Sequence, residues 1–162
     1  MNLLEYEAKN ILKQSDIPVP LGEIIRSSDN TPQAPIVLKS QVHSGGRGKA
    51  GGVKVVKSGD SGVIAEEIFT LPIKGELPKT ILAEEVLQIA NEYYLALMIN
   101  RTDATIELVA HREGGIEVEA HDSNEFFRNE ITPTTVSALG DTLADYFDLS
   151  AKSFALQDLL EK

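Results

Sequence analysis

The chain has 162 residues and a mass of 17.6 kDa, which is enough for one domain of ordinary size or for two small lobes. Its 25 acidic and 15 basic residues give a formal net charge of -10, which opposes binding to nucleic acid. The lack of cysteine excludes disulfides, thiolate metal sites and a cysteine nucleophile, and no apolar run approaches the roughly 20 residues that span a bilayer.

An amphipathic helix is predicted at the start of the chain, over residues 3–13, with Asn2 as its N-cap. Its apolar positions recur at helical spacing: Leu3, Leu4, Ala8, Ile11 and Leu12. Glu5 and Glu7 lie where a secretory signal would carry basic and then apolar residues, so we expect a protein that stays inside the cell.

A hairpin with a glycine-rich loop is predicted next. After a short β-branched strand at 22–27, the apolar segment PIVLKSQV at 35–42 predicts a second strand. Residues 43–52, HSGGRGKAGG, contain five glycines and lead into VKVVK at 53–57. The order strand, glycine loop, strand predicts an antiparallel pair.

The middle of the chain carries a helix and further strands. Asp60 is predicted to cap a helix over 61–71, which Pro72 ends, and strand character resumes at 81–87. The segments 93–101 and 105–112 flank a turn signal, which predicts another antiparallel hairpin.

The last part of the chain is predicted to be helical over 134–147 and 151–160, whereas 117–127 predicts no regular element. The first of these helices has apolar residues spaced for one buried face: Val136, Leu139, Leu143, Tyr146 and Phe147.

The glycine loop could cradle an anion. Its backbone N–H groups and the side chains of Arg47 and Lys49 could surround phosphate oxygens, and Lys54 adds to this basic cluster. The alternative is a flexible hairpin with solvated charges. A Walker loop and a dinucleotide-binding loop are disfavoured, because Lys49 is followed by Ala50 and then by a strand rather than a helix.

Lys39 lies inside the apolar strand IVLKSQV. If its side chain faces the interior, its ammonium group must pair with an anion, for which a phosphate would serve. If it faces outward, it is an ordinary charge on a half-buried strand.

Residues 38–54, LKSQVHSGGRGKAGGVK, closely resemble the phosphate-binding hairpin of succinyl-CoA synthetase β subunits. The opening MNLLEYEAKNILKQSDIPVPLG, the segment ILAEEVLQIANEYYLALMINR and EGGIEVE at 113–119 resemble the same family in the same order. The resemblance implies an α+β, ATP-grasp-like fold in which two small lobes hold the nucleotide. It places a lid-like lobe at about 17–98 and a second lobe at about 1–16 plus 99–162, together forming a partial ATP-grasp domain over 1–162.

The resemblance also implies site residues. Lys39 would contact the α- and β-phosphates of ATP or ADP (or GTP or GDP), and the loop Gly46, Arg47 and Gly48 would cover the phosphates. Glu84, Leu87 and Glu92 match family positions near the base and ribose, and the alternative for the two glutamates is ordinary exposed strand charge.

The reaction implied by the resemblance joins a dicarboxylic acid to coenzyme A at the expense of ATP or GTP, in the tricarboxylic acid cycle, in the cytoplasm or a mitochondrial matrix. It runs through an acyl phosphate and a phosphohistidine on a partner α subunit. His43, His111 and His121 are therefore expected to be surface or packing residues. Two other readings are a stand-alone, non-catalytic ATP-grasp-like module that binds a nucleotide or a partner, and an interaction domain that binds no nucleotide.

The sequence departs from the family in three places. SDNTPQAP replaces a helix of the first lobe, the connection from Val56 to Ile81 is shorter, and Leu87 replaces a small polar residue. The family's Mg²⁺ ligands, an Asn and an Asp, are expected beyond Lys162, so residues 1–162 alone are not expected to make a thioester.

Overall fold

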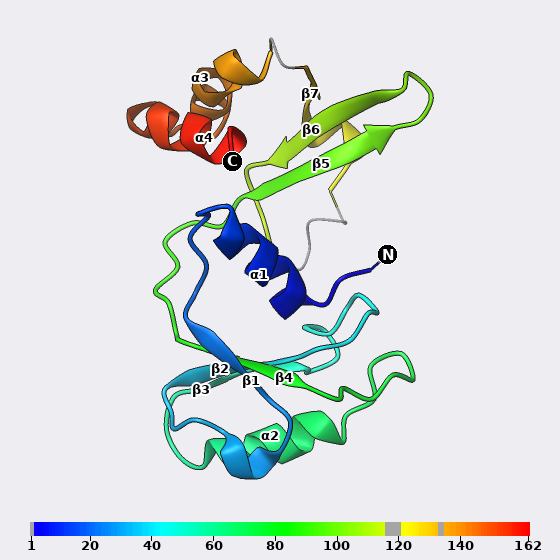
Figure 1. Ribbon diagram of the computed structural model, residues 1–162, viewed down its shortest axis with the longest axis vertical. Helices are drawn as coiled ribbons and strands as arrows, with labels where there is room; N and C mark the ends of the chain where they lie inside the picture. Colours follow the sequence, from blue (N-terminus) through cyan, green and yellow to red (C-terminus); the bar gives the residue numbers. More distant parts are fainter. Residues whose placement is uncertain (1, 116–120, 133–134) are drawn as a thin grey trace. The chain divides into compact units, whose positions relative to one another are not determined.

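The computed structural model describes residues 2–115, 121–132 and 135–162, without the side chains of residues 136 and 137. The chain forms two compact units, Met1–Gln88 and Ile89–Lys162, each with its own sheet and helices (Figure 1). This mixture of helix and sheet confirms the α+β class. Part of EGGIEVE, residues 116–119, and Thr134 lie outside the described residues.

The first unit is built on a four-stranded sheet in the order β1-β4-β2-β3, with every neighbouring pair antiparallel. Its strands are β1 (Gly22–Ile25), β2 (Ile36–Ser40), β3 (Val53–Val56) and β4 (Ile81–Glu84). Since β2 and β3 are joined by the glycine loop, the predicted hairpin is confirmed. A short 3₁₀ turn, Ser28–Asn30, lies in the segment SDNTPQAP, where the resemblance implies that a helix is missing.

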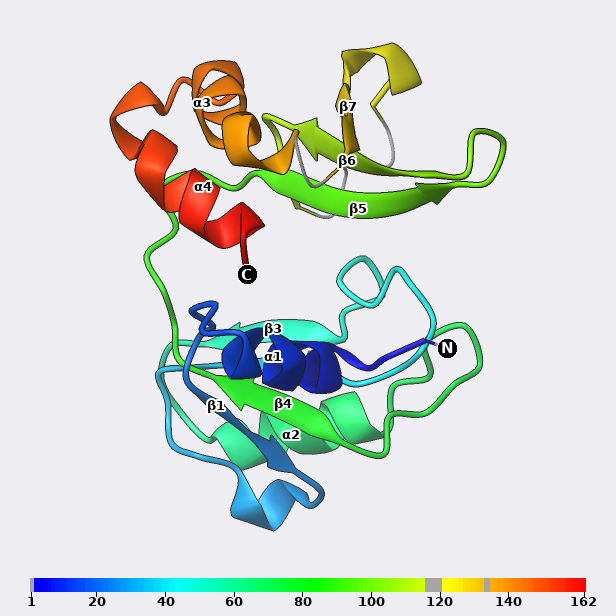
Figure 2. The same ribbon diagram turned by 45° about the horizontal axis from the view of Figure 1, so that its top comes forward.

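Helix α2 (Ser61–Phe69) covers one face of this sheet and begins at the predicted cap, since Asp60 accepts a hydrogen bond of 2.9 Å from the N–H of Gly62. Apolar side chains of the helix and the sheet form a common core: Ile25, Ile36, Leu38, Val56, Ala65, Ile68, Ile81 and Ala83. Figure 2 shows α2 and α1 on opposite faces of the sheet.

Helix α1 (Glu5–Gln14) covers the other face and differs from the prediction. It begins at Glu5 after Leu4, not after Asn2, and the Glu7 carboxylate accepts a hydrogen bond of 2.8 Å from the N–H of Leu4. None of its ten residues is buried, and the apolar side chains of Ile11 and Leu12 are 50% and 40% exposed. Ion pairs to the sheet attach α1 to the first unit, whereas the sequence prediction grouped residues 1–16 with the second lobe.

The second unit has a three-stranded antiparallel sheet in the order β5-β6-β7. Strands β5 (Tyr94–Asn100) and β6 (Thr105–His111) form the predicted hairpin, whereas β7 (Phe127–Ile131) was not predicted. Helices α3 (Val136–Tyr146) and α4 (Ser153–Leu160) confirm the helical tail, and 3₁₀ turns lie at Ser123–Glu125 and Ser150–Lys152. Its buried core consists of Leu108, Ala110, Leu139, Leu143 and Phe147.

Within the described ranges, no helix is long and apolar enough to cross a bilayer.

Candidate functional site

Lys39 lies on the α1 side of the first sheet. Burial alternates along β2: Leu38 and Ser40 are completely buried, while Lys39 between them keeps a 21% exposed side chain. Successive side chains of a strand point to opposite faces, so Lys39 points away from the core that Leu38 forms with α2. The sequence left open which way Lys39 faces. In the structure its charged side chain lies between the sheet and helix α1.

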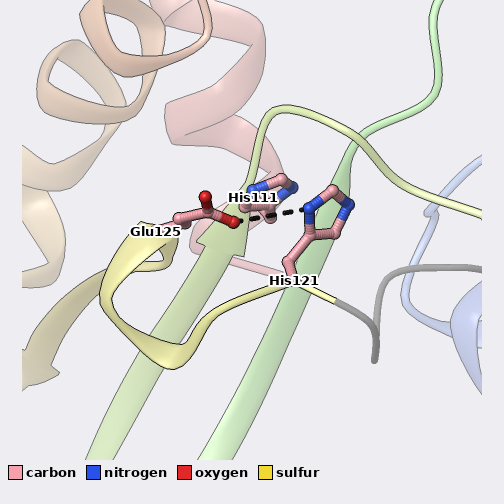
Figure 3. A group of neighbouring side chains, drawn as sticks. All are labelled: His111, His121 and Glu125. Carbon is pink, nitrogen blue, oxygen red and sulfur yellow. Dashed lines mark ion pairs between the residues drawn. The ribbon is translucent and has the colours of Figure 1, made fainter.

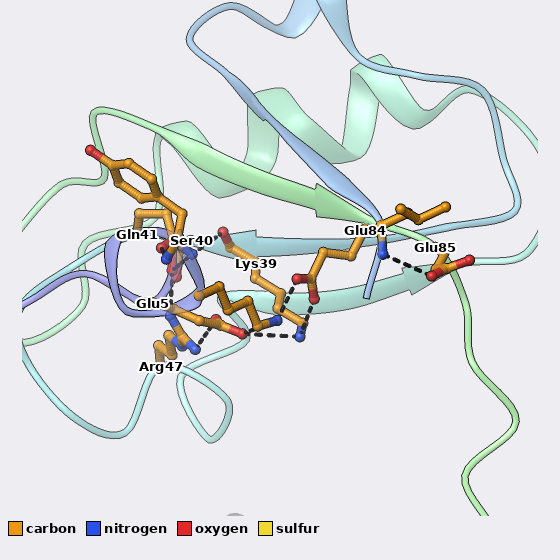
Figure 4. Close-up of polar contacts among 10 residues, drawn as sticks. Glu5, Lys39, Ser40, Gln41, Arg47, Glu84 and Glu85 are labelled. Atoms are coloured by element: carbon orange, nitrogen blue, oxygen red, sulfur yellow. Dashed lines mark hydrogen bonds and ion pairs between the residues drawn. The ribbon is translucent and has the colours of Figure 1, made fainter. Parts of the chain in front are cut away.

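Lys39 is part of a network of five charged side chains (Figure 4). Its Nζ lies 2.6 Å from Glu84 Oε2 and 3.2 Å from Glu5 Oε1. Lys9, one turn along α1, lies 2.9 Å from Glu5 Oε1 and also pairs with Glu84. The Arg47 guanidinium pairs with the other oxygen of Glu5 and donates a hydrogen bond of 3.2 Å to the carbonyl of Ser40. Three cations surround two carboxylates, which leaves one positive charge in excess.

The network favours the charged forms of Glu5 and Lys39. Burial raises the pKa of Glu5, but the hydrogen bond from Lys9 and the charges of Arg47 and Lys39 outweigh it and lower this pKa to about 2. Burial also opposes the charge of Lys39, but the hydrogen bond to Glu84 and the charges of Glu5 and Glu84 raise its pKa. Glu84 is 2% exposed, so the alternative of an exposed strand charge is wrong for this residue.

The glycine loop is folded by its own backbone. The N–H of Ala50 donates to the carbonyl of Gly46 (3.0 Å), and the N–H of Gly52 donates to the carbonyl of Arg47 (2.8 Å). Gly46 has a φ of +89°, which favours glycine. A Cβ on Gly52 would lie 2.4 Å from the Oγ of Ser40, a buried hydroxyl that has no hydrogen-bond partner in the described part of the chain. Glycine at these two positions therefore holds the loop against the sheet and presents Arg47 to α1.

A carboxylate already binds at the start of this loop. Glu76 accepts the N–H of His43 at 3.1 and 3.3 Å, and it lies 3.2 Å from Nδ1 of the same residue. Desolvation raises the pKa of Glu76, but the hydrogen bonds from the backbone and ring of His43 outweigh it and lower this pKa. The backbone at this point is therefore able to hold an anionic oxygen.

The expected basic cluster of Arg47, Lys49 and Lys54 is divided between the two faces of the sheet. Lys54 is opposite Leu38 in the β2–β3 register, and its Nζ lies 3.3 Å from Glu67 of α2. The prediction is therefore wrong for Lys54.

Gly48 and Leu87, two further predicted residues of the first unit, are not members of the charged network. The carbonyl of Gly48 accepts the N–H of Gly51 at 3.1 Å, and Leu87 is 51% exposed after β4. Glu92 belongs to the second unit, where its carbonyl accepts the N–H of Gly114 at 2.9 Å. Among the predicted positions of the first unit, the structure thus brings together Lys39, Arg47 and Glu84.

Sequence reasoning missed Glu5, Lys9 and Glu76. A signal for the first two was present, because a glutamate four residues before a lysine forms an ion pair on a helix. Their long-range partners had no signal in the local pattern.

A cavity of about 620 Å³ lies on the α1 side of the same sheet. Its walls include Tyr6, Lys9 and Lys13 from α1, Pro18 and Leu21 from the following segment, and Glu84 from β4. This volume is within the range of small-molecule sites, and Lys9 and Glu84 belong to both the cavity and the charged network.

Comparison with solved structures indicates the fold. The chain matches PH1788 from Pyrococcus horikoshii with a TM-score of 0.74 and 21% identity, covering 98% of this chain and 74% of that one. It matches the Ca. Korarchaeum cryptofilum protein ACD1, solved in complex with coenzyme A, with a TM-score of 0.72 and 18% identity, covering 98% and 76% of the two chains.

Curated proteins match at higher identity. The chain is 44% identical over 126 residues to the ADP-forming succinate–CoA ligase β subunit of Ignicoccus hospitalis, covering 74% of this chain and 34% of that one. It is 38% identical over 126 residues to the GDP-forming β subunit of Thermus thermophilus, covering 74% and 33%. The chain spans about a third of the length of these relatives.

A family model described as an ATP-grasp domain matches residues 2–138, which include the charged network, the glycine loop and all strands of both sheets. The α+β architecture, the likeness to solved structures and this match agree, so the chain belongs to the ATP-grasp domain family.

Proposed function

We propose that this chain is the nucleotide-binding part of an acid–CoA ligase and holds the phosphates of ATP or ADP, or of GTP or GDP, on the α1 face of its first sheet. One observation carries the proposal: Lys39 from strand β2 and Arg47 from the glycine loop converge on a single carboxylate, that of Glu5. Two cations that share one carboxylate are spaced to share a phosphate.

In this proposal the phosphates exchange with the internal carboxylates. Lys39 turns from Glu5 to the α- and β-phosphates, and Arg47 with the N–H groups of Gly46 to Gly48 covers them. The exchange keeps both cations paired at every stage, so no charge is left buried alone. Glu84 holds Lys39 and Lys9 in place during the exchange, and its carboxylate accepts a ribose hydroxyl.

The finer assignments are part of the same proposal. The first unit corresponds to the lid-like lobe, and Leu87 and Glu92 contribute to the base and ribose side of the nucleotide. The similarity to succinate–CoA ligase β subunits supports a role of the whole protein in acyl-CoA synthesis. In that role a dicarboxylic acid is activated in the cytoplasm, as a step of the tricarboxylic acid cycle, through a phosphohistidine on a partner α subunit.

The residues around the loop do not fit a Mg²⁺ ion. Magnesium needs oxygen ligands in a near-octahedral arrangement. Glu5 and Glu84 are each held by two or three cations, and Glu76 is held by the backbone and ring of His43. No step of the proposed binding therefore passes through a metal ion at these residues.

Titration calorimetry with ADP tests the proposal. Lys39→Ala and Arg47→Ala are each expected to weaken ADP binding by roughly tenfold or more, because a hydrogen bond between charged groups is lost. Lys54→Ala is the matched control, since it removes a lysine from the same hairpin on the α2 face and is expected to leave the affinity unchanged. Equal affinities for all four proteins, or a loss with Lys54→Ala alone, would overturn the proposal. Circular dichroism checks that each variant is folded.

A further inference from the structure

A second cluster of polar side chains lies wholly within the second unit, far in sequence from the charged network. His111 ends strand β6, while His121 and Glu125 lie in the segment that leads through the 3₁₀ turn to β7. One ligand atom from each of the three lies within 4.8 Å of the others. Figure 3 shows the two imidazoles and the carboxylate gathered at the end of β6.

The spacing of these atoms suits a small cation. His121 Nδ1 lies 3.5 Å from Glu125 Oε2. Two ligands about 2.1 Å from a tetrahedral zinc ion are about 3.4 Å apart, so this pair is close to its bound separation. The three ligand atoms lie within 4.8 Å of one another, so the side chains need to move only slightly toward a bound ion.

The carboxylate is oriented by its own turn. Glu125 Oε2 accepts the N–H of Asp122 at 3.2 Å, and the Asp122 side chain accepts the N–H of Glu125 in return, which makes a capping box. The Asp122 side chain also accepts the N–H of Asn124 at 3.1 Å. It aims the carboxylate at His121 without using all of its lone pairs.

The first imidazole is held in place by its surroundings. His111 is 8% exposed, and its ring packs 5.0 Å from the ring of Phe126. Its Nδ1 accepts the N–H of Glu113 at 3.1 Å in one tautomer and can donate to the carbonyl of the same residue, at 2.9 Å, in the other. Metal binding through Nε2 uses the second tautomer, in which Nδ1–H donates to this carbonyl and Nε2 has its lone pair for the metal.

The second imidazole has a carboxylate on each side. His121 Nδ1 faces Glu125, and its Nε2 lies 3.7 Å from Oε2 of Glu113. A carboxylate behind the free ring nitrogen fixes the orientation of a metal-bound histidine and increases its basicity.

The two rings lie against each other, with centroids 4.0 Å apart and planes inclined by 32°. This contact holds the two imidazoles side by side.

From this arrangement we propose that His111, His121 and Glu125 bind a divalent transition-metal ion of the Zn²⁺ class, with Glu113 as a supporting residue. Two imidazoles and one carboxylate suit zinc and its neighbours, whereas Mg²⁺ and Ca²⁺ prefer oxygen ligands alone. Three protein ligands leave a coordination position open for water or another ligand. The site does not depend on the proposed nucleotide function.

Zinc titration of the 162-residue chain tests the site. Calorimetry with ZnCl₂ is expected to show one equivalent bound, and excess MgCl₂ is expected not to compete. Glu125→Gln and His121→Gln, both at positions that are not buried, are each expected to weaken binding by roughly tenfold or more. His43→Gln is the matched control, because His43 is the one histidine of the chain outside the cluster and lies beside a different carboxylate, Glu76. It is expected to leave the affinity unchanged.

An independent readout uses the unaltered protein. Zinc is expected to shift the imidazole NMR resonances of His111 and His121 and to leave those of His43 in place. Failure of the chain to bind zinc, a shift confined to His43, or unchanged affinity in both cluster variants would overturn the proposal and leave the cluster as a packing arrangement of aromatic rings.

Discussion

The two faces of the sheet in the first unit are covered by helices that are held in different ways. Helix α2 lies on an apolar face, where Leu38, Ile68 and Ile81 are completely buried. Helix α1 lies on the opposite face with no buried residue of its own, and its described contacts to the sheet include ion pairs to Lys39 and Glu84. The same four strands thus carry a core on one face and a polar site on the other.

The apolar α2 face is suited to stabilise the fold, whereas the charged α1 face is suited to bind a ligand. Burial of apolar surface stabilises the α2 face whatever the solution contains. Partly exposed ion pairs contribute little net stability, because solvation offsets most of their attraction. A phosphate, which carries more negative charge, can replace a carboxylate in such pairs. The cations of the α1 face can therefore exchange Glu5 for a nucleotide without any change in the apolar core on the α2 face.

The largest effect is expected from a cavity on the apolar face. Leu38→Ala removes a completely buried side chain and is expected to lower the free energy of unfolding by about 2–5 kcal/mol. Val55→Ala, at a 54% exposed position on the neighbouring strand, is expected to change it by no more than about 0.5 kcal/mol. Urea unfolding followed by far-UV circular dichroism measures both. Similar losses for the two variants would show that the α2 face is not the main core.

Loss of the Glu5 charge on the α1 face is expected to lower the free energy of unfolding by less, and the loss depends on pH. The pKa of Glu5 is lowered from 4.5 to about 2, so its contribution is fully present above pH 4.5 and is lost as the pH falls toward 2. Above pH 5, Glu5→Gln is expected to lower the free energy of unfolding by on the order of 1 kcal/mol.

Urea unfolding of wild type and Glu5→Gln at a series of pH values measures this difference, which should shrink between pH 4.5 and 2. The matched control is Glu67→Gln. Glu67 lies on α2, and its carboxylate forms an exposed ion pair with Lys54 of β3. A constant difference between wild type and Glu5→Gln down to pH 2 would show that the ion pairs do not hold α1.

The smallest effect is expected at the start of the glycine loop. Glu76→Gln removes a negative charge that occupies the N–H of His43 and competes with a phosphate. Binding of ADP is expected to tighten by roughly twofold, the scale of an exposed charge pair. Calorimetry compares the two proteins, and a large loss of affinity would instead mean that Glu76 shapes the loop.

The local elements could be predicted because their signals are local. The β2–β3 hairpin follows from two β-branched runs around five glycines, and α2 follows from Asp60 and Pro72. Strand β7 was missed because FRNEI has apolar residues only at its two ends, with Arg, Asn and Glu between them, which is a weak apolar pattern. It is defined by pairing with β6 rather than by its own composition.

The site was predicted only in part, for a related reason. The strand and loop sequence identified Lys39 and Arg47, but their partner Glu5 is 34 and 42 residues away in the chain. No local pattern indicates which carboxylate will reach a given lysine. The start of α1 was misplaced because Asn2 is a favourable cap by residue type, whereas Glu7 satisfies the N–H of Leu4 instead.

The most direct test of the exchange of anions on the α1 face is an NMR titration of the chain with ADP. The amide resonances of Lys39 and of the loop from Ser44 to Gly48 are expected to shift on binding. Those of Asp60 and Gly62, at the start of α2, are expected to stay in place. Shifts at the start of α2 without any change in the loop would contradict the account.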